Sequence, residues 1–146
     1  MPVHIVDLLD NAMQEAGVQL KGTTVCVLGY AFLENSDDAK NTPTFSLIKE
    51  LERRGVKYKI HDPYIKADQD LKIGQDLNQA LQDCDAVVLM TKHDEYKNIS
   101  PVSLGGILRN KIVIDGRNMF DPGDFVANGF VFKGVGKGNV GNRRGL

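Results

Sequence analysis

The chain has no tryptophan and only two cysteines, Cys26 and Cys84, among its 146 residues. The two cysteines lack the close spacing of metal ligands, and so low a cysteine content is typical of a reducing compartment, so we expect a cytoplasmic protein. Cys26 lies within a predicted strand and Cys84 at the end of a predicted helix. We therefore interpret both as packed thiols rather than as nucleophiles.

The sequence also lacks any apolar run near the ~20 residues of a membrane span, and no signal-peptide pattern opens it. Its formal net charge of −1 argues against binding to nucleic acid or to a membrane surface through bulk electrostatics. With 42% apolar and 25% charged residues, the composition is that of an ordinary globular domain. The length suffices for one domain with its own core.

What the sequence does contain is a regular alternation of strand-like and helix-like segments. Short apolar β-rich runs predict strands at residues 23–28, 56–61, 71–73, 86–90, 111–114 and 130–133. Capping residues and apolar periodicity predict intervening helices that begin at Thr42-Pro43, Asp76, Ser100 and Asp121. This order predicts an α/β fold, a Rossmann-like, doubly wound, mainly parallel sheet preceded by an amphipathic helix.

The amphipathic helix is predicted at residues 2–16, where Pro2 suits the first turn and Gly17 the end. Apolar residues recur along it at intervals of three or four: Ile5, Leu8, Leu9, Ala12, Met13 and Ala16. The stripe either packs on its own domain or belongs to a helix that joins domains. Because the sheet's helices look complete without it, we expect the stripe to pair with a second copy in a homodimer.

The loop between the strand at 23–28 and the helix at Pro43 is longer than usual for such connections. It carries two carboxylates, Asp37 and Asp38, and a cation, Lys40. The aspartates could hold a metal or accept a phosphoryl group, but a receiver-type phosphoacceptor domain requires a lysine where Asp115 stands. We expect them instead to shape the loop or to meet basic groups of a neighbouring domain, with no metal site.

The first turn does not match a dinucleotide-binding fingerprint. Gly29-Tyr30-Ala31-Phe32 places bulky side chains where such a turn needs bare backbone. A literal G-x-G-x-x-G at residues 136–141 lies five residues from the end of the chain and opens no helix. We expect the basic, glycine-rich tail at 136–146 to be flexible.

In a parallel sheet, the segments that follow the strands at 23–28, 86–90 and 111–114 converge on one edge. The potential anion ligands there are Lys40, Lys92, His93 and Arg117. Arg117 is the strongest candidate, because its planar guanidinium suits phosphate or carboxylate, although a surface ion pair with Asp115 or Asp121 is the alternative. His93 is either a general base or, as we favour, a hydrogen-bonding loop residue.

Several segments together resemble the C-terminal, UDP-binding domain of the UDP-glucose / UDP-N-acetylmannosamine / GDP-mannose dehydrogenase family. The resemblance extends over residues 2–135. The segments that carry it are Gly29-x-Ala31-Phe32, Asn35-Ser36-Asp37-Asp38-x-Lys40-Asn41-Thr42-Pro43, His61-Asp62-Pro63-Tyr64, Thr91-Lys92-His93-Asp94-Glu95-Tyr96 and Asp115-Gly116-Arg117-Asn118.

The resemblance implies that Arg117 and Phe32 contact a UDP-sugar, together with Leu33, which replaces the family's usual lysine. Lys40 stands where an arginine is common, on the cofactor side of the domain interface. It also implies that NAD and the catalytic cysteine belong to an N-terminal NAD-binding domain and a central domain outside this chain. No catalytic residue is expected here.

The expected organisation is an inter-domain type helix and linker at 1–20, a Rossmann-like UDP-sugar-binding domain at 21–135 and the tail at 136–146. The expected function is to position the nucleotide in an NAD-dependent nucleotide-sugar 6-dehydrogenase of polysaccharide biosynthesis, an oxidoreductase. The isolated chain would then be inactive. The alternative is a non-catalytic nucleotide-binding or dimerisation module with the same fold.

Overall fold

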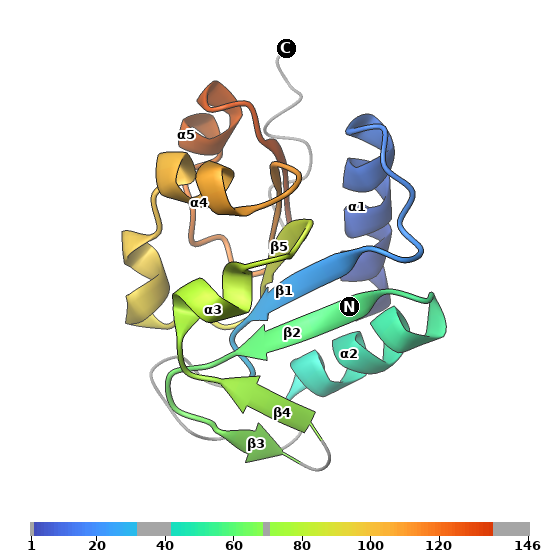
Figure 1. Cartoon of the computed structure of the whole chain (residues 1–146), viewed down its shortest axis with the longest axis vertical. Helices are drawn as coiled ribbons and strands as arrows, with labels where there is room; N and C mark the ends of the chain where they lie inside the picture. Colours follow the sequence, from blue (N-terminus) through green and yellow to red (C-terminus); the bar gives the residue numbers. More distant parts are fainter. Residues whose placement is uncertain (1, 32–41, 69–70, 136–146) are drawn as a thin grey trace.

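The described part of the chain, residues 2–31, 42–68 and 71–135 of a computed structural model, contains a seven-stranded sheet in the order β3-β4-β2-β1-β5-β6-β7 (Figure 1). All neighbouring strands are parallel except β3, which runs antiparallel to β4. The predicted mainly parallel sheet is therefore confirmed. The strands are Thr24–Leu28 (β1), Lys57–His61 (β2), Ala67–Asp68 (β3), Leu71–Gly74 (β4), Ala86–Leu89 (β5), Ile112–Asp115 (β6) and Val131–Gly134 (β7).

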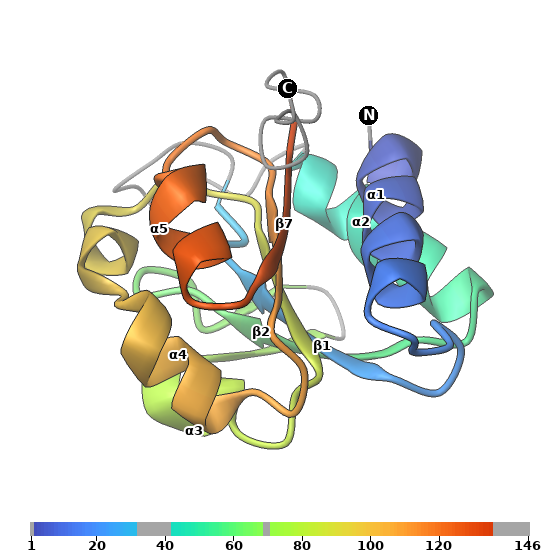
Figure 2. The same ribbon diagram turned by 90° about the horizontal axis from the view of Figure 1, so that it is seen from above.

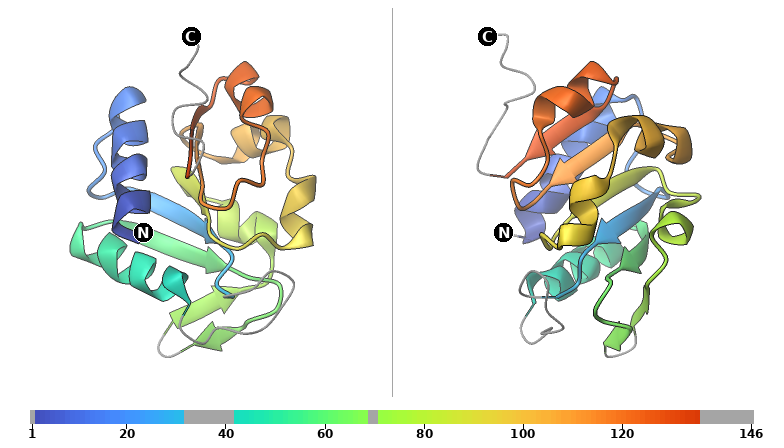
Figure 3. Two further views of the ribbon diagram at one scale, coloured as in Figure 1. Left: turned by 180° about the vertical axis from the view of Figure 1, so that it is seen from behind. Right: turned by 90° about the vertical axis from the view of Figure 1, so that its left-hand side faces the viewer.

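Helices cover both faces of this sheet, as a doubly wound fold requires (Figures 1 and 2). On one face lie α1 (Pro2–Glu15) and α2 (Pro43–Arg53). On the other lie α3 (Leu77–Leu81), α4 (Pro101–Ile107) and α5 (Pro122–Ala127). The views from behind and from the side show the same two helical layers on either side of the twisted strands (Figure 3).

The helices begin where the sequence places their caps. The side chains of Thr42, Asp76, Ser100 and Asp121 each accept a hydrogen bond from a backbone amide in the first turn that follows. A cap of this kind contributes about 1 kcal/mol, and proline at the first position of α2, α4 and α5 fixes φ in advance. These local signals explain why short helices recur between the strands.

Alternate strand residues enter two separate cores, one beneath each helical layer. Val25 and Val27 of β1 face the core under α1 and α2, whereas Cys26 and Leu28 face the core under α3, α4 and α5. Cys84 lies in the second core with Cys26, and both are free and buried, which confirms that they are packed thiols. Because both faces are covered, the central strands read as continuous apolar runs.

The expectation that the stripe of α1 pairs with a second copy is wrong, because the stripe is buried within its own domain. Of its six residues, Ile5, Leu9, Ala12 and Met13 are at most 1% exposed and belong to the core under α1 and α2, whereas Leu8 is half-buried and Ala16 is exposed. The helix lies beside α2 and packs over β6 and β7. The partner of the apolar stripe is therefore the sheet of the same chain together with α2, and not a second copy of α1.

Ion pairs connect α1 to α2 and to β7. Arg54, which follows α2, bonds Asp7 of α1 at 2.8 Å and also Glu50 of α2 at 2.6 Å. The Arg53 and Arg54 guanidinium groups lower the pKa of Glu50 to about 2. At the C-terminal end of α1, the buried Lys133 of β7 pairs with Glu15.

Smaller expectations also need correction. The segment between β2 and β4 contains a short strand, β3, that was not predicted. A 3₁₀ helix, η1 (Asp94–Asn98), was not predicted. None of the described helices is both long and apolar enough to span a membrane.

Candidate functional site

The segments that follow four adjacent strands form one edge of the sheet. Tyr30-Ala31 follows β1, 62–65 follows β2, 91–93 follows β5 and 116–118 follows β6. The order β2-β1-β5-β6 and the parallel pairing bring these segments side by side over about 14 Å, three strand spacings of about 4.8 Å. The predicted convergence of the strand ends is therefore confirmed, and we call these four segments the ligand edge. Ligands of open α/β sheets bind at this edge.

The loops after β1 and β5 are in direct contact at Gly29. Gly29 has a φ of +96°, and a Cβ atom there would lie 2.4 Å from Cβ of Thr91. The hydroxyl of Thr91 donates to the carbonyl of Ala31 at 2.7 Å. A glycine is required at the end of β1 because the two loops leave no space for a side chain.

The carboxylate of Asp62 ties three of the four segments together. Its Oδ2 accepts hydrogen bonds from the amides of Tyr30 at 2.8 Å and Ala31 at 2.9 Å. Its Oδ1 accepts from the amides of Tyr64 at 2.7 Å and Ile65 at 3.1 Å. Asp62 is fully buried, so these bonds replace all its contacts with water.

A histidine completes the environment of this carboxylate. His93 Nε2 lies 2.9 Å from Oδ2 of Asp62, and both side chains are fully buried. Because the carboxylate carries no hydrogen, Nε2 is the donor. Burial raises the pKa of Asp62, but the bonds from His93 and the backbone amides outweigh it and hold that pKa below its usual range. The prediction of His93 as a hydrogen-bonding loop residue is confirmed.

Aromatic rings surround the Asp62–His93 pair. The ring of Tyr64, which is 47% exposed, lies 4.9 Å from that of His93. The buried ring of Tyr96 lies 5.8 Å from that of His93, and its hydroxyl is 2.9 Å from His61 Nδ1. The Asp62–His93 pair is therefore enclosed by packed rings, with Tyr64 open to solvent at the ligand edge.

The buried His61 makes the fold sensitive to acid. Burial lowers its pKa below 6.5, against the opposing effects of a bond to the Gln75 carbonyl and the charges of Glu95 and Asp62. The unfolded chain therefore binds the proton more tightly, and this contribution to stability, present above pH 6.5, is lost as the pH falls below it. We expect His61→Gln to be less stable than the wild type at pH 7.5, with the difference narrowing towards pH 5.

Thermal unfolding followed by circular dichroism between pH 5 and 7.5 measures this difference. His4→Gln, at an exposed position of α1, is the matched control and should track the wild type at each pH. A gap between wild type and His61→Gln that stays constant or widens in acid would contradict the assignment.

A second buried carboxylate shapes the loop after β6. Asp115 is 1% exposed and accepts bonds from the amides of Arg117 at 2.9 Å, Met119 at 2.8 Å and Phe120 at 2.7 Å. A Cβ atom at Gly116 would lie 2.7 Å from the carbonyl of Leu89, so the loop closely approaches the end of β5. Asn118 adopts a positive φ of 58°, which turns the chain back.

This loop presents Arg117 at the ligand edge with an exposed side chain. Asp115 was considered as its ion-pair partner, but the Asp115 carboxylate is occupied by backbone amides. Within the described residues Arg117 forms no ion pair, with Asp121 or any other carboxylate.

The other predicted site residues are distributed differently. Lys92 lies half-buried on the ligand edge, next to His93. Phe32, Leu33, Asp37, Asp38 and Lys40 lie outside the described residues, as does the tail at 136–146. The anchoring roles of Asp62 and Asp115 were missed, although Asp62 directly follows β2, Asp115 ends β6, and each precedes a turn residue, Pro63 or Gly116.

The turn after β1 does not fit the pyrophosphate of a dinucleotide. In dinucleotide-binding sheets, free backbone amides at this turn and at the helix that follows it hold the phosphates. Here the amides of Tyr30 and Ala31 are already bonded to Asp62, and the Tyr30 side chain is buried with its hydroxyl on Asp68 at 2.7 Å. The described part of this turn is therefore not an NAD site.

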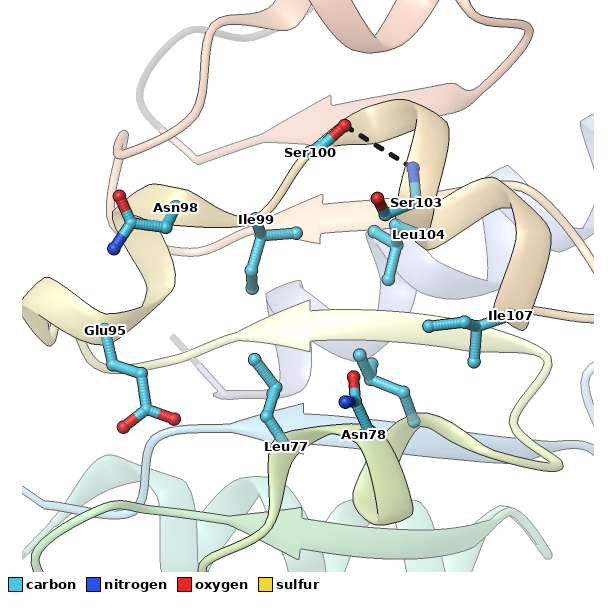
Figure 4. Close-up of a pocket in the computed structure, with 10 residues that line it drawn as sticks. Leu77, Asn78, Glu95, Asn98, Ile99, Ser100, Ser103, Leu104 and Ile107 are labelled. Atoms are coloured by element: carbon cyan, nitrogen blue, oxygen red, sulfur yellow. Dashed lines mark hydrogen bonds between the residues drawn. The ribbon is translucent and has the colours of Figure 1, made fainter.

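A separate hollow of about 180 Å³ lies between α3, η1 and α4 (Figure 4). Its walls are largely aliphatic, with Leu77, Ile99, Leu104 and Ile107 around the space and Glu95 at one end. This volume is below the roughly 300–1,000 Å³ of typical small-molecule sites. Two larger hollows, of about 390 and 360 Å³, are lined by residues of β2, β4 and α3 and by residues of α2. We place the candidate ligand site at the ligand edge because the ends of the parallel strands converge there, not because of its volume.

Comparison with known proteins shows which family the chain resembles. Residues 26–122 match the model of the UDP-glucose/GDP-mannose dehydrogenase family, UDP binding domain. The UDP-N-acetyl-D-mannosamine dehydrogenase of Pyrococcus horikoshii is 31% identical over 140 residues, which are 96% of this chain and 32% of that protein. The UDP-glucose 6-dehydrogenase of Bacillus subtilis is 31% identical over 92% of this chain and 30% of its own length.

A solved structure shares the fold in detail. The NDP-N-acetyl-D-galactosaminuronic acid dehydrogenase of Methanosarcina mazei superposes with a TM-score of 0.91 at 30% identity, over 96% of this chain and 30% of that one. The chain thus spans about a third of the length of the relatives it matches. With the family model matched over most of its length, the chain belongs to the UDP-glucose/GDP-mannose dehydrogenase family and corresponds to its C-terminal, UDP-binding domain.

Proposed function

We propose that the ligand edge binds the nucleotide of a UDP-sugar for an NAD-dependent 6-dehydrogenase that acts in the cytoplasm. The NAD-binding domain and the central domain with the catalytic cysteine would be further parts of the enzyme. The chain alone would bind the nucleotide without oxidising the sugar. Phe32 and Leu33 are proposed as additional ligand contacts, and Lys40 as a residue of the cofactor-side interface.

The single observation that carries this proposal is the presentation of Arg117. A buried carboxylate, Asp115, holds the loop by its backbone amides, and the Arg117 side chain projects from a rigid base without an ion pair among the described residues. A planar guanidinium forms two parallel bonds with phosphate oxygens. Lys92, on the neighbouring segment, adds positive charge to the same edge.

Replacing Arg117 with alanine should weaken UDP binding about tenfold or more. A charge-assisted hydrogen bond contributes roughly 1.5–3 kcal/mol, and each 1.4 kcal/mol is a factor of about ten. Isothermal titration calorimetry of the two proteins with UDP measures the difference.

Arg109→Ala is the matched control. Arg109 is also largely exposed, but it lies before β6, at the opposite edge of the sheet, where it pairs with Asp83 at 3.6 Å. UDP affinity should be unchanged in this variant. Equal affinity in wild type and Arg117→Ala would remove Arg117 from the site, and equal losses in both variants would indicate a nonspecific charge effect.

A further inference from the structure

The turn after β1 has the geometry of an anion-binding site whose anion comes from the chain itself. Two consecutive amides, those of Tyr30 and Ala31, converge on one carboxylate oxygen of Asp62 at 2.8 and 2.9 Å. Consecutive backbone amides that point at one oxygen form the type of concavity that binds phosphate in other proteins. Here the neighbouring strand supplies the negative charge.

The sheet places Asp62 in this position by its register. Leu28 pairs with His61, and the amide of Gly29 donates to the carbonyl of His61 at 2.7 Å. Asp62, the next residue, therefore lies beside the turn that follows Gly29.

Hydrogen bonds occupy both oxygens of the Asp62 carboxylate. Four backbone amides and the His93 ring surround its two oxygens, which have about four lone-pair sites in total. Every surrounding group is a donor, so a neutral side chain that presented its own hydrogen would face unfavourable contacts. The site requires an anion at this position.

We propose that Asp62 is an internal anion that occupies the phosphate position of the turn after β1, and that with His93 it positions the segments of the ligand edge. Where it concerns UDP, this inference rests on the proposed function. The consequence is that an external phosphate cannot enter the turn while Asp62 is in place. The nucleotide must bind further along the edge, towards the segments after β5 and β6 that carry Lys92 and Arg117.

Chemical rescue tests the proposal. Asp62→Ala removes the carboxylate and leaves space that a formate ion fills. We expect the variant to bind UDP at least about tenfold more weakly, and sodium formate to restore most of the affinity and of the thermal midpoint. Sodium chloride at equal ionic strength and formamide, a neutral molecule of similar shape, should restore neither.

Nuclear magnetic resonance shows whether the rescue occurs at the turn. The amide resonances of Tyr30 and Ala31 should move in Asp62→Ala and return when formate is added. In the wild type, pyrophosphate should leave these two resonances unchanged. Movement of both in the wild type with pyrophosphate would overturn the claim that the turn is closed.

Asp85→Ala is the matched control for a general loss of stability. Asp85 is also buried and accepts a backbone amide, that of Thr24 at 2.8 Å, but at the opposite edge of the sheet. Its UDP affinity should remain that of the wild type. UDP affinity in Asp62→Ala equal to that of the wild type, or unaffected by formate, would overturn the positioning role.

A second pair of variants decides the question if Asp62→Ala does not fold. His93→Gln retains an N–H donor near the position of Nε2, whereas His93→Leu has similar volume and no donor. UDP affinity should be largely retained in His93→Gln and lost in His93→Leu. Equal UDP affinities in the two variants would contradict the proposal. If the wild type binds no UDP, the proposed function fails, but the resonances of Tyr30 and Ala31 still decide whether Asp62 fills the turn.

Discussion

Replacing Leu9 and Met13 together with glutamate is expected to unfold the isolated chain. Both side chains are 0% exposed in the core under α1 and α2. A buried, unpaired carboxylate costs several kcal/mol. The cost of two such groups is comparable to the whole free energy of unfolding of a typical domain, about 5–15 kcal/mol. Far-ultraviolet circular dichroism and a thermal scan measure the loss of structure.

The control for this variant is Val3→Glu on the same helix. Val3 is 50% exposed, so a charge there remains in water and the thermal midpoint should hardly change. The packing of α1 on its own sheet would be contradicted if the wild type were a dimer and the double variant were a folded monomer.

Replacing Asp115 with alanine should destabilise the fold by about 2–5 kcal/mol and also weaken UDP binding. The amides of Arg117, Met119 and Phe120 lose their acceptor. A buried donor left unpaired, here the amide of Phe120, costs about 1–3 kcal/mol, and the two part-buried donors cost less because water reaches them. Because the Arg117 amide is among them, the loop no longer holds the guanidinium in place. Urea unfolding measures the first effect and calorimetry with UDP the second.

Asp121→Ala separates these effects from a simple capping loss. Asp121 is an exposed helix cap that accepts the amide of Gly123 at 2.9 Å, and its loss should cost about 1 kcal/mol without changing UDP affinity. If Asp115→Ala bound UDP with wild-type affinity at a temperature where it is folded, the hydrogen bonds of Asp115 would not be needed to position Arg117.

The elements of this fold were largely predictable because their signals are local. The apolar runs of β1, β5 and β6 and the caps Thr42, Asp76, Ser100 and Asp121 lie within the segments they define. The convergence of strand ends followed from the parallel sheet alone. Arg117 could be singled out because an arginine directly beyond a buried strand reaches this edge.

What could not be predicted depends on contacts between segments distant in the sequence. The donors to Asp62 come from the loops after β1, β2 and β5, so no spacing in the sequence reveals that they share one carboxylate. The place of α1 was missed for the same reason, since it precedes β1 in the chain but packs over β6 and β7. A periodic stripe indicates a buried face without indicating its partner.

The central claim, that the ligand edge binds the nucleotide, is tested most directly by titrating the ¹⁵N-labelled wild-type chain with UDP. At 16.1 kDa the chain is small enough for residue-by-residue assignment. We predict saturable shifts that are largest for the amides of Lys92, Gly116, Arg117 and Asn118. No shifts, or shifts confined to the hollow between α3 and α4 or to the opposite edge of the sheet, would contradict the account.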